Sequence, residues 1–180
     1  VAYSEVNRVA QSVSSRPRVV SLEPNTIWDV LDSIEQVGAL TGVEPAARAY
    51  VTSLRGRLDA VAARPVGERK RVYCMEWLDP PMRAGHWVPE MVELAGGSET
   101  FGNRGEPSTK TSWDSVMDYA PEVIVLMPCG FDLPRTLEEA AHMRPMLATA
   151  GAREIWAVNG SAYYSRPGPR LVDGVEILAH

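Results

Sequence analysis

The sequence predicts an α/β fold with a mostly parallel sheet, and three observations support this. A short apolar run, a turn-rich loop and a helical pattern follow one another three times from Arg71 onward. The apolar runs resemble buried strands, and strands joined by helices lie parallel, with their carboxyl ends on one edge of the sheet. A long helical pattern over 44–64 precedes these units, and a helix of that length spans roughly 30 Å, enough to link two parts of a molecule.

Composition and charge exclude several classes of protein. The 180 residues carry a net charge of −5, so the chain lacks the basic surface that nucleic-acid binding requires. The apolar fraction of 45% is that of a globular protein, and no apolar run approaches the roughly 20 residues that cross a bilayer. The N-terminus has no signal-peptide pattern, and because the chain opens on Val1 rather than methionine we expect a processed or truncated product.

The region before the long helix is predicted to form helix, strand and helix. Ser4–Val13 has an apolar helical face with Ser4 as the expected cap, and Arg18–Glu23 has the pattern of a short strand. Thr26 is the expected cap of the next helix, which Gly42 ends. These elements are part of an α/β layer that has too few strands to close a sheet.

The longest helical pattern is Glu44–Arg64. Pro45 stands in its first turn, where proline is favoured, and an apolar stripe runs along one side from Tyr50 to Val61. The pattern fits a helix that bridges two lobes, and it fits an ordinary layer helix equally well.

The remaining elements form the three repeated units. The last helical pattern before the second strand ends at Pro121, and a break at Pro145 is expected in the helix that follows that strand. The expected elements are the strand Val72–Met75, the helix Val88–Ala95, a surface loop over Ser98–Thr111, the helix Trp113–Tyr119, the strand Val123–Met127, the helix Leu133–Ala150, the strand Glu154–Val158 and the helix Arg170–Ala179.

The loops at 76–87, 128–133 and 159–170 are the candidate binding site, because open α/β sheets bind ligands at the carboxyl ends of their strands. They are rich in aromatic side chains, which suit a large, flat, partly apolar ligand, and they contain arginines and carboxylates. The alternative is that the tryptophans only cap a core, and that one of the two tyrosines packs against the last helix. The candidate ligand-binding residues are Trp77, Asp79, Pro81, His86, Trp87, Phe131, Asp132, Tyr163, Tyr164 and Arg166.

Catalytic and metal-binding motifs are absent from the sequence. We find no nucleophile elbow, zinc-protease motif, Walker loop or dinucleotide fingerprint. His86 could bind a metal or act as a base, but without a second histidine nearby a hydrogen-bonding role is favoured. The remaining enzymatic hypothesis is a Rossmann-like enzyme with Asp79, His86 and Asp132 as acid–base residues. Cys74 and Cys129 lack metal spacing, and we expect both to be buried, unpaired thiols.

Several motifs resemble a known family: EWLDPPMRAGHWVPEMVELAGG, PCGFDL and NGSAYYSRPGPRLVDGVEILA. They look like the C-terminal lobe of the periplasmic solute-binding proteins of ABC transporters that serve cobalamin, haem and ferric siderophores, and they are most similar to cobalamin-binding members. The segment RPRVVSLEPNTIWDVLDSIEQVG resembles the end of the N-terminal lobe in the same proteins.

The resemblance implies a Rossmann-like C-terminal lobe over 65–180, a backbone helix between lobes over 44–64 and a remnant of the N-terminal α/β lobe over 1–43. It implies a non-enzymatic protein of the periplasm or cell envelope, without a cofactor, that binds cobalamin or another corrinoid in a cleft between the lobes. Ferric siderophores and haem are the alternative ligands, and an ABC-transporter permease is the implied partner. Most of the first lobe is missing by comparison, so we expect its exposed sheet edge to be able to pair with a second copy.

Overall fold

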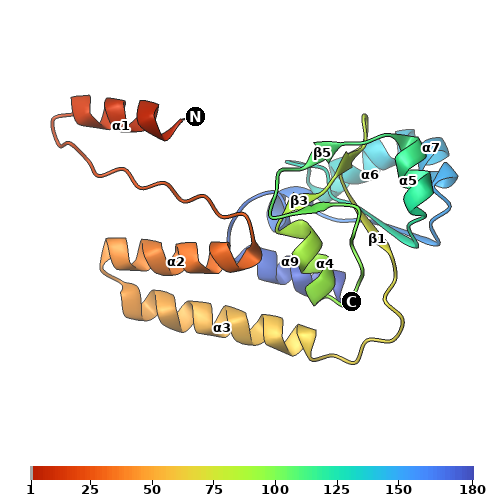
Figure 1. Cartoon of the computed structure of the whole chain (residues 1–180), viewed down its shortest axis with the longest axis horizontal. Coiled ribbons are helices and arrows are strands. Elements are labelled where there is room, and N and C mark those ends of the chain that lie inside the picture. The colour runs from red at the N-terminus through yellow and green to blue at the C-terminus, as the bar shows by residue number, and fades with distance from the viewer. Residues whose placement is uncertain (1) are drawn as a thin grey trace.

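The computed structural model describes residues 2–180 and shows a mixed α/β fold with a mostly parallel sheet, as the sequence predicts (Figure 1). The N-terminal part contributes three helices and the rest of the chain contributes seven strands and six helices. The helices are α1 (Tyr3–Ser12), α2 (Ile27–Thr41), α3 (Glu44–Ala62), α4 (Val88–Leu94), α5 (Trp113–Tyr119), α6 (Leu133–His142), α7 (Arg144–Thr149), α8 (Gly160–Tyr163) and α9 (Arg170–Leu178). The strands are β1 (Val72–Trp77), β2 (Met82–Arg83), β3 (Gly85–His86), β4 (Asn103–Arg104), β5 (Thr109–Lys110), β6 (Val123–Leu126) and β7 (Glu154–Ala157).

The main sheet has the strand order β5-β2-β1-β6-β7. β1, β6 and β7 are parallel, with Val72 beside Val123 and Val123 beside Glu154, so their carboxyl ends share one edge. β2 and β5 are antiparallel additions, because the chain turns back after Trp77 instead of leaving the sheet. A second sheet, β3-β4, forms from segments that the sequence predicts to be loops.

Successive side chains of a strand point to opposite faces of the sheet. Because apolar strand residues point to both faces of the main sheet, helices cover both faces. Val72 and Cys74 face a core shared with α2, α3, α4 and α9, whereas Tyr73 and Met75 face a second core shared with α5 and α7. This double burial explains why the β1 and β6 sequences are continuous apolar runs rather than alternating ones.

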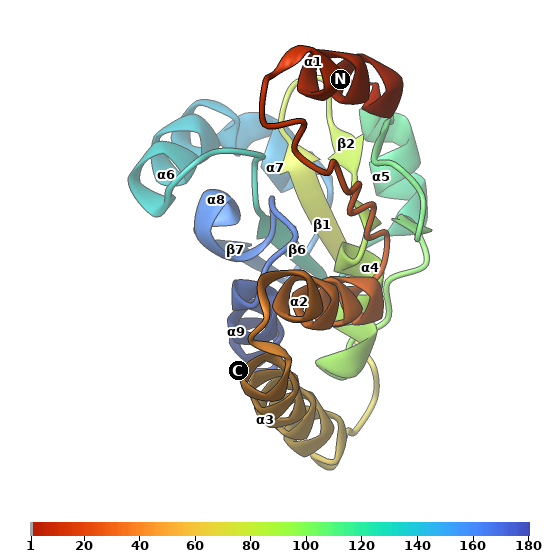
Figure 2. The same cartoon turned by 90° about the vertical axis from the view of Figure 1, so that its left-hand side faces the viewer.

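α2 and α3 form an antiparallel helical hairpin beside the sheet (Figures 1 and 2). Thr26 caps α2 and Gly42 ends it in the left-handed region at φ 75°, both as predicted. α3 is the predicted long helix, with Pro45 in its first turn. Its Arg57 forms ion pairs at 2.6 Å with Asp173 and Glu176 of α9, which join the hairpin to the C-terminal helix.

The prediction for the first 25 residues is partly wrong. The residue before α1 is Ala2, so Ser4 lies inside the helix instead of capping it. Residues 18–23 are extended but have no strand partner, and the predicted strand is therefore absent. In Figure 1, α1 stands apart from the other helices at the end of this extended segment.

Three smaller expectations are corrected in the C-terminal part. The helix predicted over 133–150 breaks at Met143 rather than at Pro145, because proline occupies the first turn of the following helix. The loop after β7 contains the short helix α8. Both cysteines are free, and Cys74 is buried as expected, but Cys129 is exposed. Within residues 2–180, no helix has the length and apolar character needed to span a membrane.

Candidate functional site

The three predicted loops meet at the carboxyl edge of the main sheet. The Cys129 N–H donates to Glu76 O at 3.0 Å, joining the second loop to the first. The Ser161 N–H donates to Phe131 O at 2.9 Å, joining the third loop to the second. These two bonds tie the three loops together through backbone atoms at the carboxyl edge of the sheet.

A cavity of about 230 Å³ lies where these loops meet. Its floor is formed by the ends of β1 and β6, and its walls by the β3–β4 segment and the loop after α8. The lining residues are Glu76, Gly85, His86, Trp87, Ser108, Met127, Cys129, Tyr164 and Ser165.

Trp87 and Tyr164 form the apolar side of the cavity and also hold the first and third loops together. Both are buried, and the Trp87 Nε1–H donates to Tyr164 O at 2.8 Å. The Tyr164 hydroxyl donates to Gly174 O in α9 at 3.0 Å, and burial raises its pKa. Two of the structural alternatives are thereby confirmed: Trp87 packs in the core, and Tyr164 is the tyrosine that packs against the last helix.

Gly85 and His86 adopt a backbone that brings the loop 106–108 over the cavity. A Cβ on Gly85 would lie 2.4 Å from Glu106 O and from Ser108 N, so only glycine fits this approach. His86 has φ 51°, its N–H donates to Glu106 O at 2.6 Å, and its ring centroid lies 5.4 Å from that of Trp87. His86 is thus held at the cavity by its backbone.

Glu76 supplies a half-buried carboxylate at the cavity floor. Desolvation raises its pKa, and the shift is opposed by a hydrogen bond from the Ser108 hydroxyl, a second one from the Gly85 N–H and the charge of His86. The cavity therefore offers an acidic group, a histidine and hydroxyls opposite an aromatic wall, an arrangement that can orient a ligand through hydrogen bonds.

Of the ten predicted binding residues, only His86, Trp87 and Tyr164 line the cavity. Trp77 lies beyond it and is 37% exposed, with its ring edge-to-face with Phe131 at 5.3 Å. The Phe131 ring is buried, and the Arg135 guanidinium lies 3.7 Å from its centroid. Asp132 caps α6 by accepting from the Arg135 N–H at 3.0 Å.

The other four predicted residues lie around these. Asp79 precedes a cis peptide bond to Pro80 and is exposed, whereas Pro81 is buried. Tyr163 is half-buried against the core beside α9, and Arg166 is exposed. Asp79 and Asp132 share no hydrogen bond in the part of the chain that the structure describes.

Sequence reasoning missed several lining residues for identifiable reasons. Ser108 lies in a stretch predicted to be a surface loop, and it directly precedes β5, whose pairing with β2 beside β1 brings it to Glu76. Met127 and Cys129 follow β6 directly and could have been assigned from their position alone. Across residues 2–180, no group of three or more His, Cys, Asp or Glu side chains is arranged to hold a metal ion.

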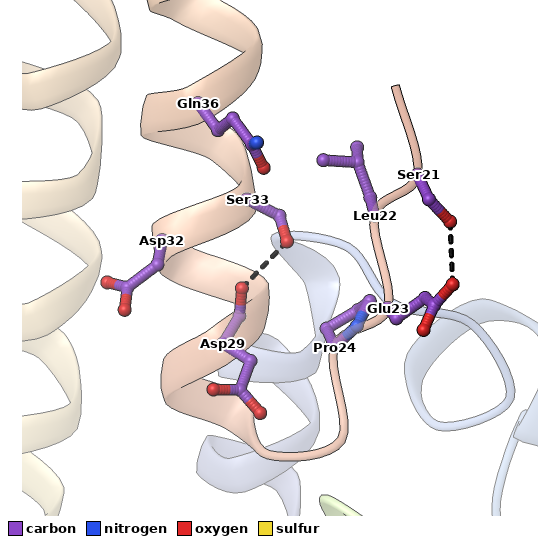
Figure 3. Close-up of a pocket in the computed structure, with 8 residues that line it drawn as sticks. All are labelled: Ser21, Leu22, Glu23, Pro24, Asp29, Asp32, Ser33 and Gln36. Atoms are coloured by element: carbon purple, nitrogen blue, oxygen red, sulfur yellow. Dashed lines mark hydrogen bonds between the residues drawn. The ribbon is translucent and has the colours of Figure 1, made fainter. Parts of the chain in front are cut away.

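A second hollow, of about 400 Å³, lies between the extended segment and α2 (Figure 3). Its carboxylates already have partners: Glu23 accepts from the Ser21 hydroxyl at 2.8 Å, Asp29 takes part in the α2 cap and Asp32 pairs with Arg55 at 2.8 Å. Capping hydrogen bonds from the backbone hold the pKa of Asp29 below its usual value. The acidic side chains of this hollow therefore serve the local structure.

Comparison with known proteins gives consistent matches. Residues 8–163 match the family described as periplasmic binding protein. The vitamin B12-binding protein of Vibrio cholerae serotype O1 is 23% identical over 160 residues, which are 86% of this chain and 55% of that protein. The chain thus spans about half the length of this curated relative.

Solved structures share the fold. A possible iron-binding periplasmic solute-binding protein from Staphylococcus epidermidis aligns over 98% of this chain and 70% of its own, with a TM-score of 0.74 and 20% identity. The periplasmic vitamin B12 binding protein of Vibrio cholerae aligns over 98% and 68%, with a TM-score of 0.67 and 20% identity. The periplasmic heme binding protein of Vibrio cholerae aligns over 95% and 70%, with a TM-score of 0.73 and 20% identity.

Proposed function

This chain belongs to the periplasmic binding protein family, and from that membership we propose that it is part of the solute-binding component of an ABC importer, binding cobalamin or a related corrinoid. The family consists of solute-binding proteins and not of enzymes, which argues against the acid–base hypothesis for Asp79, His86 and Asp132. The proposed ligand follows the curated relatives, which are described as vitamin B12-binding.

The cavity at the carboxyl edge of the sheet is the observation that carries the proposal. At about 230 Å³ it is smaller than the roughly 300–1,000 Å³ of pockets that enclose whole ligands. It therefore accommodates one edge or side group of a macrocycle, with Glu76 and Ser108 as hydrogen-bonding groups. The rest of the ligand lies against the rim, where Trp77, Tyr163 and Arg166 supply apolar contact and charge.

Haem and ferric siderophores are the alternative ligands, favoured by the structural neighbours described as heme-binding and iron-binding. His86 could contact a metal-centred ligand in two ways, through a hydrogen bond or by coordinating the metal. We propose that it donates or accepts a hydrogen bond rather than coordinating the metal.

The division of the chain forms part of the proposal. Residues 65–180 are the ligand-binding lobe, 44–64 are the backbone helix between lobes and 1–43 belong to the N-terminal lobe. A permease is the protein partner, and the site of action is the periplasm or cell envelope, by family membership.

A second copy of the chain is a further proposed partner, through the N-terminal part. α1 exposes apolar side chains, with Val6 42% and Val9 60% exposed. This exposed apolar surface favours an association of α1 with a second copy of the chain.

An absorption spectrum tests the ligand. The protein is incubated with cobalamin, cobinamide or haem and desalted, and retained visible absorption identifies the ligand that binds. We expect the corrinoids to be retained more strongly than haem, and His86→Ala to leave the position of the visible bands unchanged. Retention of haem alone would favour the alternative, and a band shift on His86→Ala would make that residue a metal ligand.

A further inference from the structure

Glu90 is a buried carboxylate that the candidate cavity does not use. It lies in the first turn of α4, three residues after Trp87, and is 3% exposed. A carboxylate so far removed from water is retained only where both oxygens have strong partners. Each oxygen of Glu90 bonds to a different segment, and neither segment belongs to α4.

The first partner is the start of α2. The Glu90 Oε2 atom accepts a hydrogen bond from the Ile27 N–H at 3.0 Å, across 63 residues of sequence. Thr26 and Asp29 satisfy the neighbouring amides, since Asp29 Oδ2 accepts from the Thr26 N–H at 2.8 Å, and Ile27 is fully buried. Glu90 therefore completes the cap from outside the helix, where the positive end of the helix dipole also favours a carboxylate.

The second partner is the wall of the cavity. The Glu90 Oε1 atom pairs with the Arg104 guanidinium in β4 at 2.5 Å, and Arg104 also pairs with Glu93 at 3.1 Å. β4 lies in register with β3, with Arg104 beside His86. Both backbone groups of His86 bond to this segment, through Glu106 O at 2.6 Å and the Gly105 N–H at 2.9 Å.

We propose that Glu90 is a positioning residue for the candidate ligand site, because its buried carboxylate joins the first turn of α2 to the β3–β4 segment that holds His86. The Glu90 side chain bonds to both segments, and its loss would leave the buried Ile27 N–H without its acceptor and Arg104 with Glu93 as its remaining partner. This coupling of α2 to the β3–β4 segment through Glu90 does not depend on a ligand. Its effect on the affinity for cobalamin rests on the proposed function.

Hydrogen–deuterium exchange of the whole chain tests the coupling. Glu90→Gln keeps the size of the side chain but leaves one acceptor oxygen for two donors. We expect exchange at Ile27 and at His86, Gly105 and Glu106 to become faster together, by about tenfold or more. Glu93→Gln is the matched control, because Glu93 lies on the same helix and pairs with the same arginine, and within residues 2–180 its carboxylate has no hydrogen bond or ion pair with α2. It should leave exchange at Ile27 unchanged.

Faster exchange at Ile27 alone would overturn the proposal and reduce Glu90 to a cap of α2. Equal effects of Glu90→Gln and Glu93→Gln would overturn it as well. If Glu90→Gln fails to fold, Arg104→Gln takes its place, since the Arg104 side chain is 54% exposed. Faster exchange at Ile27 in that variant supports the coupling, and unchanged exchange contradicts it.

Cobalamin affinity separates positioning from general stability. Val92→Ala is the stability control, because Val92 is buried in α4 and lies outside the cavity. Glu90→Gln should weaken binding about tenfold, while Val92→Ala should lower the melting temperature without changing the affinity. Equal affinity of Glu90→Gln and the unaltered chain would contradict the positioning role. If the unaltered chain binds neither cobalamin nor haem, the proposed function fails while the exchange result still decides the coupling.

Discussion

Trp77 and Trp87 lie near the two ends of one loop but have different surroundings. Trp87 is 8% exposed and its ring N–H donates to Tyr164 O, whereas Trp77 is 37% exposed and its ring N–H donates to Asp79 O within its own loop. Trp77 is therefore free to contact a ligand, and Trp87 supports the cavity wall.

Substitution of the two tryptophans should separate these roles. Trp77→Ala should weaken cobalamin binding roughly two- to tenfold, the value of one aromatic contact, with little loss of stability. Trp87→Phe removes the hydrogen bond to Tyr164 O and should lower the free energy of unfolding by about 1–2 kcal/mol. Calorimetric titration and urea denaturation measure the two effects. Unchanged affinity in Trp77→Ala would remove this residue from the site.

Glu99 should give the stability an unusual pH dependence. It is buried, and although its carboxylate accepts from the Phe101 and Gly102 N–H groups, desolvation raises its pKa from 4.5 to about 7. Glu93 contributes in the same direction and Arg83 opposes it. Because the folded state holds this proton more tightly than the unfolded state, stability should fall as the pH rises from about 4.5 to about 7.

The size of the effect is on the order of 3 kcal/mol. Glu76, whose pKa is raised for the same reason, adds to it. The carboxyls of Glu122, Glu154 and Glu176 have lowered pKa values, so urea denaturation between pH 5 and 8 avoids their titration. Glu99→Gln should flatten the profile, and an equal slope in the variant would contradict this account.

For single residues, the sequence predicts which aromatic and charged side chains the loops carry, but not which rings are buried and which face the solvent. Trp87 is buried because Tyr164 and α9, far along the chain, close over it. Asp132 looks like a ligand residue in sequence, yet its position before Leu133 makes it a helix cap. The packing of distant segments decides the role of Trp87, whereas the role of Asp132 as a cap follows from its local position.

Among the elements, those with strong local signals were predicted correctly. α2 has the Thr26 cap and a left-handed glycine at its end, α3 has Pro45 in its first turn, and both have apolar stripes that need no partner to be recognised. The segment 18–23 has strand composition, but a strand exists only where another strand pairs with it, and none does among residues 2–180. β3 and β4 were missed because two-residue strands have no periodicity.

Alanine substitution of Gly160 should show how closely the strand-end loops approach one another, and substitution of Gly56 in α3 is the comparison. A Cβ on Gly160 would lie 2.5 Å from Pro128 O, so Gly160→Ala must displace the backbone and should cost about 1–3 kcal/mol. Gly56 lies in α3 with nothing within 4 Å of its Cβ position, so Gly56→Ala should stabilise by about 0.5–1 kcal/mol. Urea denaturation compares the pair, and a neutral Gly160→Ala would mean that the loops are not in contact.

In the whole molecule, limited proteolysis should cleave the N-terminal segment before Ile27 first. The bond after Arg18 lies in extended, exposed chain, whereas the exposed Arg69 and Lys70 are tied to Gly97 O and Glu154. Trypsin should therefore cut a dilute sample at Arg18 before 69–71, and more slowly in a concentrated sample if a second copy covers this segment. Equal resistance of both sites in the dilute sample would show that the N-terminal segment is supported within one copy.

Isothermal titration of the chain with cobalamin tests the central claim most directly, namely that the carboxyl edge of the sheet binds a large macrocycle. The cavity encloses only part of such a ligand, so we expect a dissociation constant in the micromolar range, about −8 kcal/mol, weakened by Trp77→Ala. Cobinamide, haem and a ferric siderophore are titrated in parallel. No heat with any of the four, or an affinity that Trp77→Ala leaves unchanged, would contradict the claim.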